Sequence, residues 1–361
     1  MWKIGAIIIL LIGIGGLFYI KNTRNTNIAD VVDNLFGEIE QSENLGGTDK
    51  VEPFPLSIEA LRNGEYPGSD LIIEQELAPG SNYQRYIVSY KSEGLKQFAL
   101  LTVPNADPPE GGYPAIVFNH GYIPPAQYKT TERYVAYTDA FSRNGYVVLK
   151  PDYRGHGNSE GQASGGYGSN GYTIDVLNAV GSIKKLSSPS TSLGEDRLPL
   201  INPNSIGMWG HSMGGFITLR SMVVSKDIKA GVIWGGVVGS YSDLFDRWRR
   251  RSAPSGTPSI RGGSWRQQLS NQYGTPEANP EFWDSLSANN YLSDISGPIE
   301  LHHGENDTSV PVEFSLNLEQ QLKAVDKEVE LFVYSGDDHN ISANLSLALS
   351  RSVEFFDRYL K

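Results

Sequence analysis

The chain has 361 residues, and its 39% hydrophobic and 20% charged side chains are ordinary for a globular protein with a buried core. A formal net charge of −11 argues against nucleic acid as a partner. The absence of cysteine excludes disulfides, thiol catalysis and thiolate metal ligands, and it leaves the redox compartment open.

The N-terminus carries an uncharged, mostly aliphatic run, Ile4–Ile20. At ~1.5 Å per residue, a helix of this length spans about 25 Å, just short of a bilayer's hydrocarbon core. The end of the run supplies no small-residue cleavage site of the kind that a secretory signal needs. We therefore expect residues 1–21 to form an uncleaved membrane anchor, with the rest of the chain outside the cytoplasm. A cleaved signal peptide is the alternative.

Residues 22–69 are expected to link this anchor to a folded domain. Between Ile28 and Ile39 the apolar residues follow helical spacing, which predicts a short amphipathic helix within the linker. Such a helix either rests on the membrane surface or docks on the domain, and the sequence favours neither arrangement.

Residues 70–361 read as one α/β domain. Three strands open it, joined by turns at Pro79-Gly80 and Glu93-Gly94, and predict an antiparallel start to a sheet. Beyond them, short apolar runs alternate with helical patterns, which predicts a mostly parallel, twisted sheet with helices on both faces. The predicted strands are Leu71–Leu77, Tyr83–Tyr90, Leu95–Val103, Ala115–Phe118, Tyr146–Lys150, Ile206–Trp209, Ala230–Trp234, Ile299–His302 and Val329–Tyr334, and the predicted helices are Glu132–Arg143, Tyr172–Leu186, Met213–Val224, Glu313–Ala324 and Ala343–Tyr359.

One segment, residues 240–291, breaks this alternation. It lacks a clear strand, and we expect it to form a helical cap above the functional site. Its arginines include Arg247, Arg249, Arg250, Arg251 and Arg261, and the cluster at 247–251 suggests either a binding site for a substrate carboxylate or a solvated helix face. The second interpretation is favoured, because charge runs are usually solvated.

The strongest motif is Gly210-His211-Ser212-Met213-Gly214, which lies between a predicted strand and a predicted helix. This context is typical of a nucleophile elbow, in which a tight turn presents the serine above the sheet. Gly210 and Gly214 are the residues that avoid steric conflict in such a turn. Ser212 is therefore the predicted nucleophile, placed at the positive end of the following helix.

A serine nucleophile needs a base, and in folds with this elbow the chain order is serine, acid, histidine. Of the six histidines, only His339 follows the last predicted strand. Asp307 follows the preceding strand and is the predicted acid that orients His339, with Glu305 as the nearest competitor.

An oxyanion hole needs two backbone N–H groups that point at the reacting oxygen. Met213, the residue after the nucleophile, is expected to supply one of them. The loop after the strand Ala115–Phe118 contains His120-Gly121-Tyr122, and the N–H of Tyr122 is the predicted second donor. The competing interpretation of this loop is a plain turn at His120-Gly121.

The cluster of His302, His303, Glu305 and Asp307 also suggests a metal site, but its spacing argues against one. Adjacent strand residues point to opposite faces of a sheet, so His302 and His303 are poorly placed to share an ion. The spacing matches no H-E-x-x-H pattern. We predict neither a metal nor a cofactor.

These motifs together resemble the α/β-hydrolase superfamily, and within it the prolyl oligopeptidase (S9) catalytic domain and dienelactone-hydrolase-like enzymes. The residues that carry the resemblance are Gly210–Gly215, the loop Asp152–Ser159, Asp307 and His339. The resemblance implies a serine hydrolase that cleaves ester or peptide bonds through an acyl-enzyme intermediate. It also implies a small molecule or a short peptide as the substrate, and it gives the Asp152–Ser159 loop a place in the wall of the site.

The chain departs from the S9 oligopeptidases in one respect. Those enzymes carry a β-propeller before the catalytic domain, and a propeller needs at least four blades of ~40–50 residues each. The stretch before residue 70 is too short for one, which leaves peptidase specificity open. A carboxylesterase or dienelactone-hydrolase-like esterase is the alternative, and a non-catalytic, membrane-tethered binding protein is a remote one. The sequence makes no prediction of oligomeric state.

Overall fold

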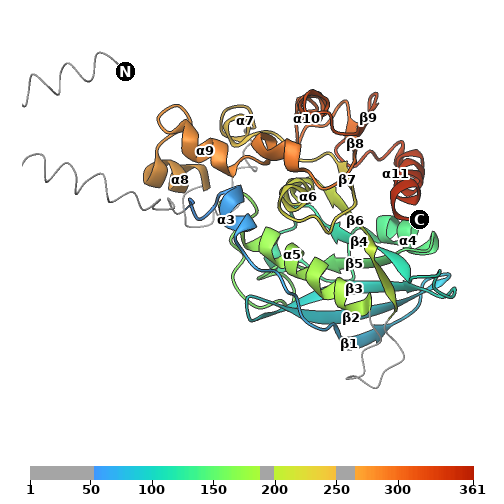
Figure 1. Cartoon of the computed structure of the whole chain (residues 1–361). Coiled ribbons are helices and arrows are strands. Elements are labelled where there is room, and N and C mark those ends of the chain that lie inside the picture. Colours follow the sequence, from blue (N-terminus) through green and yellow to red (C-terminus); the bar gives the residue numbers. More distant parts are fainter. Residues whose placement is uncertain (1–52, 188–198, 249–264) are drawn as a thin grey trace, which may run out of the picture. The chain divides into compact units, whose positions relative to one another are not determined.

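The computed structural model describes residues 53–187, 199–248 and 265–361 (Figure 1). The predicted membrane anchor and the predicted linker helix lie outside these residues. Among the described helices, none is long and apolar enough to cross a membrane.

The folded domain begins before the expected boundary at residue 70, because the compact unit that contains it spans Pro53–Lys361. A short helix, α3 (Ile58–Arg62), opens the domain and buries Ile58 and Leu61 in the main core. The side chain of Arg62 donates to the carbonyl of Val223, at the end of a central helix. Residues 53–69 are therefore part of the domain rather than linker. A five-residue helix is too short to show a periodic pattern in the sequence.

One mixed sheet of nine strands organises the described residues, in the order β1-β2-β3-β5-β4-β6-β7-β8-β9. The first three strands are antiparallel, β3 pairs antiparallel with β5, and the strands from β5 to β9 are parallel to one another. The predicted fold class is thus confirmed. The strands are β1 (Ile72–Leu77), β2 (Tyr83–Ser92), β3 (Leu95–Pro104), β4 (Tyr113–Asn119), β5 (Val147–Pro151), β6 (Ile201–His211), β7 (Ala230–Trp234), β8 (Ile299–Gly304) and β9 (Val329–Tyr334).

Helices cover both faces of the sheet, as predicted (Figure 1). The strand pleat explains why two cores form, since successive side chains point to opposite faces. In β4, Ala115 and Val117 join one core, whereas Ile116 and Phe118 join the other. The first core is covered by α5 (Gly171–Lys184), α6 (Met213–Val224) and α10 (Glu313–Ala324), and the second by α4 (Val135–Arg143) and α11 (Leu345–Leu360).

Helix α4 begins at Val135, three residues later than its sequence predicts. Arg133 and Tyr134 have φ angles of 59° and 53°, in the left-handed region that only glycine occupies without strain. Helical propensity is therefore overridden at these two residues by contacts that Tyr134 makes elsewhere in the fold. These contacts belong to the functional site and are described below.

The described part of the segment between β7 and β8 (residues 235–248 and 265–298) forms helices and loops. It contains α7 (Tyr241–Asp246), α8 (Trp265–Tyr273), α9 (Pro280–Leu286) and a 3₁₀ helix, η3 (Ala288–Asp294). Figure 1 shows α7, α8 and α9 gathered beside α3 at one side of the domain. Phe282 and Trp283 are fully buried there, so this insertion has an apolar interior. Of its arginine cluster only Arg247 is described, and its guanidinium lies 3.5 Å from the Asp243 carboxylate, one helical turn away.

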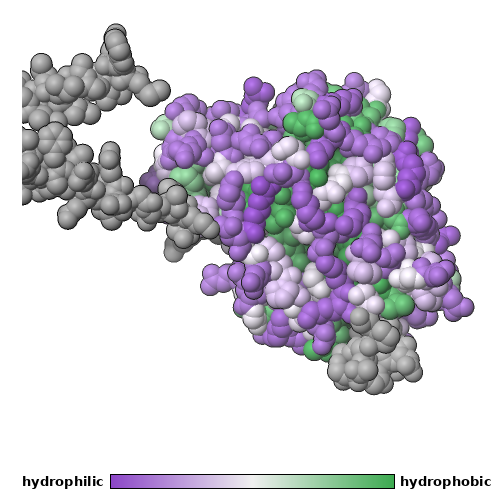
Figure 2. Space-filling model, viewed as in Figure 1, coloured by the Kyte–Doolittle hydropathy of each residue, from purple (hydrophilic) through white to green (hydrophobic). Residues whose placement is uncertain are grey.

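The surface in the view of Figure 2 is mostly hydrophilic, and its hydrophobic residues form small separate patches. Two further 3₁₀ helices, η1 (Pro125–Gln127) and η2 (Lys185–Ser187), complete the described elements. The first of them lies in the loop after β4, next to the site described below.

The register of the parallel strands brings the predicted site residues to one edge. Asn119 pairs with Gly210, His211 with Trp234, and Trp234 with His302. These residues stand at the carboxyl ends of their strands, where open α/β sheets hold their ligands. The loops that follow β4, β6, β8 and β9 therefore leave the sheet at this edge.

Candidate active site

Ser212 occupies a strained turn between β6 and α6. Its φ and ψ angles of 56° and −117° lie outside the regions that non-glycine residues prefer. Its backbone N–H donates to the Trp234 carbonyl of the neighbouring strand at 2.9 Å, and its own carbonyl accepts from Val237 at 3.1 Å. The end of β7 and the loop that follows it thus hold the turn in place.

The two predicted elbow glycines have no room for a side chain. A Cβ at Gly214 would stand 1.9 Å from the carbonyl oxygen of Asn119, at the end of β4. A Cβ at Gly210 would stand 2.3 Å from the carbonyl oxygen of Gly214. Glycine at 214 lets the start of α6 approach the end of β4, and glycine at 210 lets α6 fold back onto β6. The loop after β4 thereby comes close to the turn that carries Ser212. Met213 is the first residue of α6, where backbone N–H groups have no partner within the helix.

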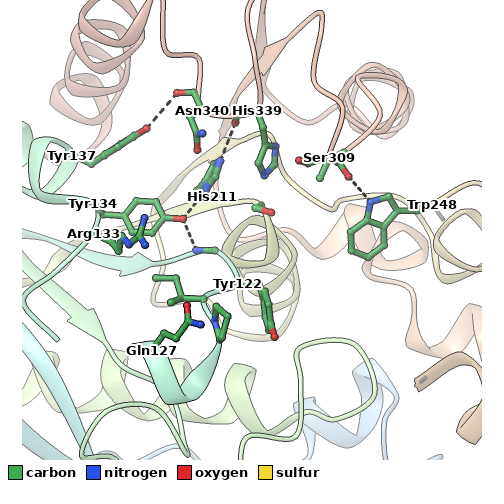
Figure 3. Close-up of a pocket in the computed structure, with 15 residues that line it drawn as sticks. Tyr122, Gln127, Arg133, Tyr134, Tyr137, His211, Trp248, Ser309, His339 and Asn340 are labelled. Atoms are coloured by element: carbon green, nitrogen blue, oxygen red, sulfur yellow. Dashed lines mark hydrogen bonds between the residues drawn. The ribbon is translucent and has the colours of Figure 1, made fainter. Parts of the chain in front are cut away.

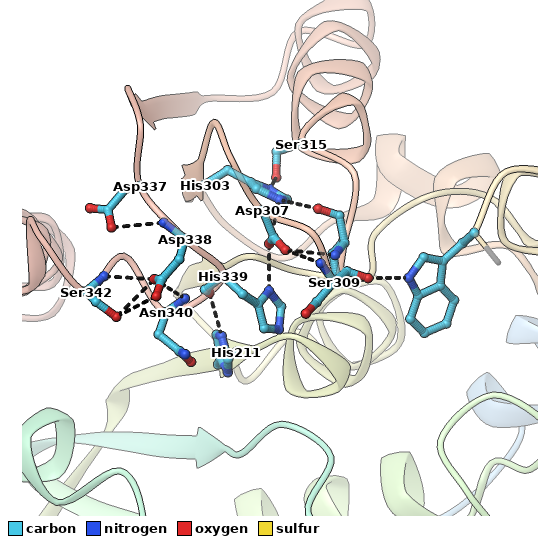
Figure 4. Close-up of polar contacts among 12 residues, drawn as sticks. His211, His303, Asp307, Ser309, Ser315, Asp337, Asp338, His339, Asn340 and Ser342 are labelled. Atoms are coloured by element: carbon cyan, nitrogen blue, oxygen red, sulfur yellow. Dashed lines mark hydrogen bonds and ion pairs between the residues drawn. The ribbon is translucent and has the colours of Figure 1, made fainter. Parts of the chain in front are cut away.

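His339 and Asp307 form a short hydrogen bond (Figure 4). The Nδ1–H of His339 donates to Oδ2 of Asp307 at 2.6 Å. The other carboxylate oxygen, Oδ1, accepts from the backbone N–H groups of Ser309 and Val310 at 2.7 and 2.9 Å. The backbone thereby fixes the carboxylate, and the carboxylate fixes one nitrogen of the imidazole.

Asp307 has a second imidazole partner, because Nε2 of His303 lies 3.2 Å from Oδ2. Burial by itself would raise the pKa of Asp307, but the hydrogen bonds from His303 and His339 outweigh it and hold the pKa well below its usual value. The group is therefore a carboxylate at neutral pH. Glu305, the competing acid, is engaged elsewhere and accepts from Ser335 and Gly336.

The loop that carries His339 is shaped by two other carboxylates. Asp337 is buried and accepts from the backbone of Ala343 and Asn344, at the start of the last helix. Asp338 accepts from Asn340 at 2.9 Å, on the other side of the histidine. Burial would raise the pKa of each carboxyl, yet these hydrogen bonds leave both pKa values lowered. Both groups serve the backbone of the loop rather than the imidazole of His339.

Ser212 and His339 line the same cavity, which has a volume of about 450 Å³ (Figure 3). Aromatic side chains form much of its wall, and Arg133 contributes the one guanidinium among the described lining residues. On the side of the insertion, Trp248 donates through Nε1 to the carbonyl of Ser309 at 2.8 Å. The remaining lining residues are Gly121, Tyr122, Ile123, Pro124, Gln127, Tyr134, Tyr137, His211, Val310 and Asn340.

The loop after β4 borders this cavity with Gly121 and Tyr122. The N–H of Gly121 donates to the hydroxyl of Tyr134 at 2.9 Å, so it is not directed at a substrate. A Cβ at Gly121 would lie 2.7 Å from the same hydroxyl, which explains glycine at this position. These contacts are compatible with Tyr122, the next residue, as the oxyanion donor of the loop.

The Asp152–Ser159 loop lies against the β4 loop. The hydroxyl of Tyr153 donates to the carbonyl of His120 at 3.1 Å, and the two rings stack with centroids 4.2 Å apart. Arg154 anchors the loop to helix α5 through a bidentate pair with the buried carboxylate of Asp175. Asp152 is buried as well and accepts from Tyr128. The loop thus supports the backbone that would hold an oxyanion.

The structure adds three site residues that sequence patterns missed. Gly235 has a φ of 48°, and a Cβ there would lie 3.1 Å from Nδ1 of His339 and 3.3 Å from Oδ2 of Asp307. His303 supports Asp307, and Tyr134 binds the β4 loop. Gly235 follows the strand Ala230–Trp234 in a Gly-Gly pair, the only signal in the sequence that could have suggested it.

His302 and His303 point to opposite faces of the sheet, as their adjacent positions predict. His302 contacts Tyr334 and Glu300, and His303 contacts Ser315 on helix α10. Within the described ranges, no three histidine or acidic side chains are grouped so as to hold a metal ion.

A protein-family model described as the prolyl oligopeptidase family matches residues 133–361. The chain is 26% identical over 264 residues to the uncharacterized peptidase YtmA of Bacillus subtilis (strain 168), covering 73% of this chain and 88% of that protein. It is also 26% identical over 269 residues to the uncharacterized peptidase YuxL of the same organism, covering 71% of this chain and 35% of YuxL.

Among solved structures, the acylaminoacyl peptidase of Pyrococcus horikoshii is similar with a TM-score of 0.59 and 21% identity. The alignment covers 78% of this chain and 42% of that one, so the similarity concerns less than half of the peptidase. Est1E of Butyrivibrio proteoclasticus, solved with ferulic acid, has a TM-score of 0.53 and 20% identity, with 75% of this chain and 98% of Est1E covered. At these identities the likeness concerns the fold.

Proposed function

The chain belongs to the prolyl oligopeptidase family and is a serine hydrolase, and on this basis we propose that Ser212, His339 and Asp307 form its catalytic triad. The observation that carries the proposal is the 2.6 Å hydrogen bond between Asp307 and His339, with His339 and Ser212 lining one cavity. Each of the three residues follows a parallel strand at the same edge of the sheet.

In the proposed reaction, Nε2 of His339 takes the proton of the Ser212 hydroxyl as its oxygen attacks the substrate carbonyl. Asp307 holds the other nitrogen, Nδ1, in its protonated form, so the lone pair lies on Nε2. The imidazolium then gives its proton to the leaving alcohol or amine. Water, activated by the same histidine, releases the acid from the acyl-enzyme and restores Ser212.

The tetrahedral intermediate carries a negative oxygen that needs hydrogen-bond donors. We assign this role to the backbone N–H groups of Met213, at the start of α6, and Tyr122, in the β4 loop. The N-terminal end of α6 also carries positive potential from the helix dipole. Loss of one such donor typically lowers kcat by ~100-fold or more.

The test is covalent labelling with a fluorophosphonate probe. Wild-type protein should be labelled at Ser212, and labelling should vanish in Ser212→Ala. Glu305→Gln is the matched control, because this carboxylate lies in the same loop as Asp307 but binds Ser335 instead of His339. Labelling of Ser212→Ala at the wild-type rate would refute the triad.

For the substrate, we propose an ester or a short peptide amide with a small apolar or aromatic acyl group. The aromatic wall formed by Tyr122, Tyr134, Tyr137 and Trp248 and the size of the cavity support this class. The similar structures include both a peptidase and a ferulic-acid-bound Est1E. A panel of p-nitrophenyl esters beside aminoacyl and dipeptidyl amides separates the two bond types. If unlabelled enzyme from a preparation that reacts with the fluorophosphonate probe hydrolyses neither class, this choice of substrates is wrong.

We also propose that Ile4–Ile20 tethers the enzyme to a membrane, with the hydrolase domain outside the cytoplasm. The support is the uncharged aliphatic sequence and the lack of a cleavage site after it. Fractionation of expressing cells should recover the full chain in membranes after a carbonate wash, and a chain starting at residue 53 in the soluble fraction. Full-length protein in the soluble fraction would overturn this proposal.

A further inference from the structure

Three hydrogen bonds connect the β4 loop, the nucleophile elbow and the loop that carries His339 (Figure 3). The N–H of Gly121 lies 2.9 Å from the hydroxyl oxygen of Tyr134. That hydroxyl lies 2.8 Å from Nδ1 of His211, the residue before the nucleophile. Nε2 of His211 lies 3.0 Å from the backbone carbonyl of His339. The residues are far apart in sequence, so only the fold brings them together.

The direction of each bond follows from what the atoms can donate. A carbonyl only accepts, so Nε2 of His211 must carry a hydrogen and donate it to His339. In a neutral imidazole Nδ1 is then an acceptor, and the Tyr134 hydroxyl must donate to it. The hydroxyl oxygen in turn accepts the backbone N–H of Gly121. Every donor and acceptor in this series is matched, with one arrangement of protons.

The charge state of His211 agrees with this arrangement. Burial, together with the nearby His339, lowers the pKa of His211 to about 3. A proton that His339 takes from Ser212 therefore does not pass to His211, although the two rings lie 4.6 Å apart. His211 remains a neutral link throughout turnover at ordinary pH.

Resting on the proposed function, we propose that Tyr134 and His211 are positioning residues that couple the oxyanion loop to the loop carrying His339. Gly121 directly precedes Tyr122, the assigned oxyanion donor, and the last bond of the series holds the backbone of the catalytic histidine itself. A displacement of the β4 loop or of the loop that carries His339 is therefore resisted by the other loop, through the side chains of Tyr134 and His211.

The backbone around Tyr134 supports this assignment. Arg133 and Tyr134 both have positive φ angles, and such strain persists only where surrounding contacts over-determine it. The buried ammonium of Lys150 donates to the carbonyl of Glu132 at 3.2 Å, just before the strained pair. The ring of Tyr134 packs edge-on against Phe118, in the strand that leads to the β4 loop. The strained conformation delivers the hydroxyl to its two partners.

The first test is Tyr134→Phe, which removes the hydroxyl and keeps the ring. We expect kcat for a p-nitrophenyl ester to fall ~10–100-fold while KM stays within about twofold, because donor placement matters more in the transition state than in binding. Tyr83→Phe is the matched control, since its hydroxyl binds Asp139 on helix α4 at 3.0 Å, away from the cavity. Equal kcat values for the two variants would overturn the proposal while leaving the triad standing.

Substitutions at His211 separate the two halves of the series. Asparagine places an amide oxygen where Nδ1 stands and retains the bond from Tyr134, whereas glutamine places an amide N–H where Nε2 stands and retains the bond to His339. In a double-mutant cycle, Tyr134→Phe should lower kcat much less in the His211→Gln background than in wild type. The reason is that His211→Gln has already removed Nδ1, the atom that accepts the hydrogen bond from the Tyr134 hydroxyl. Strictly additive effects would refute the coupling. A thermal melt checks that each variant is folded.

A direct measurement of the proton positions completes the test. In protein labelled with ¹⁵N-histidine, two-bond proton–nitrogen correlations should report His211 as the Nε2–H tautomer, assigned by its loss in His211→Asn. The Nδ1–H tautomer would overturn the proposed bonds whatever the kinetics show. Labelling by the fluorophosphonate probe that does not depend on Ser212 would instead refute the proposed function, and the coupling with it.

Discussion

Gly235→Ala is the substitution with the clearest consequence, because it adds one methyl group beside the Asp307–His339 pair. The new Cβ would lie 3.1 Å from both Nδ1 and the carbonyl oxygen of His339, and 3.3 Å from Oδ2 of Asp307. These distances are a few tenths of an ångström too short, so either the histidine or the aspartate must move. The φ of 48° adds backbone strain that glycine does not feel.

The close contacts of the new methyl group and the backbone strain at a positive φ together set the expected loss of stability. The left-handed conformation disfavours alanine by ~1–2 kcal/mol, and overpacking a tight site typically costs about 1–3 kcal/mol. We therefore expect unfolding free energy to fall by roughly 2–5 kcal/mol in total. A misplacement of 1 Å in an active site lowers the rate ~100-fold, so a shift of a few tenths should lower kcat about 3–10-fold.

Gly94→Ala is the control, because Gly94 has a φ of 80° in the β2–β3 hairpin and a Cβ there would meet nothing within 4 Å. This variant should lose ~1–2 kcal/mol of stability and keep the wild-type kcat. Urea unfolding and ester hydrolysis measure the two quantities for both proteins. A Gly235→Ala enzyme whose kcat equals that of Gly94→Ala would show that the methyl group does not disturb the Asp307–His339 pair.

Three further predictions concern charge. Asp307→Asn should lower kcat by up to ~10⁴-fold, because an amide N–H in place of Oδ2 favours the wrong tautomer of His339; a loss of less than tenfold in ester hydrolysis would contradict this role. Burial raises the pKa of Asp152 to about 6, because the folded state favours the protonated carboxyl. This carboxyl therefore destabilises the fold least below about pH 4, and the free energy of unfolding declines as the pH rises through 6. Urea unfolding at pH 4 and 6 should show this decline, at most roughly 3 kcal/mol, in wild type and not in Asp152→Asn; an equal slope in both would refute it. Arg133→Gln should raise KM up to about fivefold for p-nitrophenyl glutarate and leave it unchanged for p-nitrophenyl valerate; equal effects on both esters would exclude an ion pair with the substrate.

Much of the candidate site could be predicted because its signals are local. The glycines of Gly210–Gly214 mark a tight strand-to-helix turn, whose geometry depends on a few neighbouring residues. The chain order of the α/β-hydrolase fold then restricts the base to the loop after the last strand, which contains His339. Glu305 remained a competitor of Asp307 in the sequence, and the structure separates them, since Asp307 holds the imidazole of His339 and Glu305 binds Ser335.

The domain boundary and the start of α4 were wrong because neither depends on local pattern. α3 is stabilised by burial of Ile58 and Leu61 in a core formed by distant segments, and its own sequence is too short for a periodic signal. At Tyr134, helical propensity loses to hydrogen bonds with Gly121 and His211. Propensity per residue is below ~1 kcal/mol, so a few tertiary contacts reverse it.

The sequence by itself determined the order of the nine strands along the chain, the tight turn at Gly210–Gly214 and the identity of the triad candidates, because these depend on adjacent residues and on the succession of elements. Only the tertiary structure decided that Gly235 must lack a side chain beside His339, and that Tyr134 reaches the β4 loop and His211 at once. Such requirements arise where separate segments pack within a few ångströms of one another, and the spacing of residues along the chain carries no record of those distances.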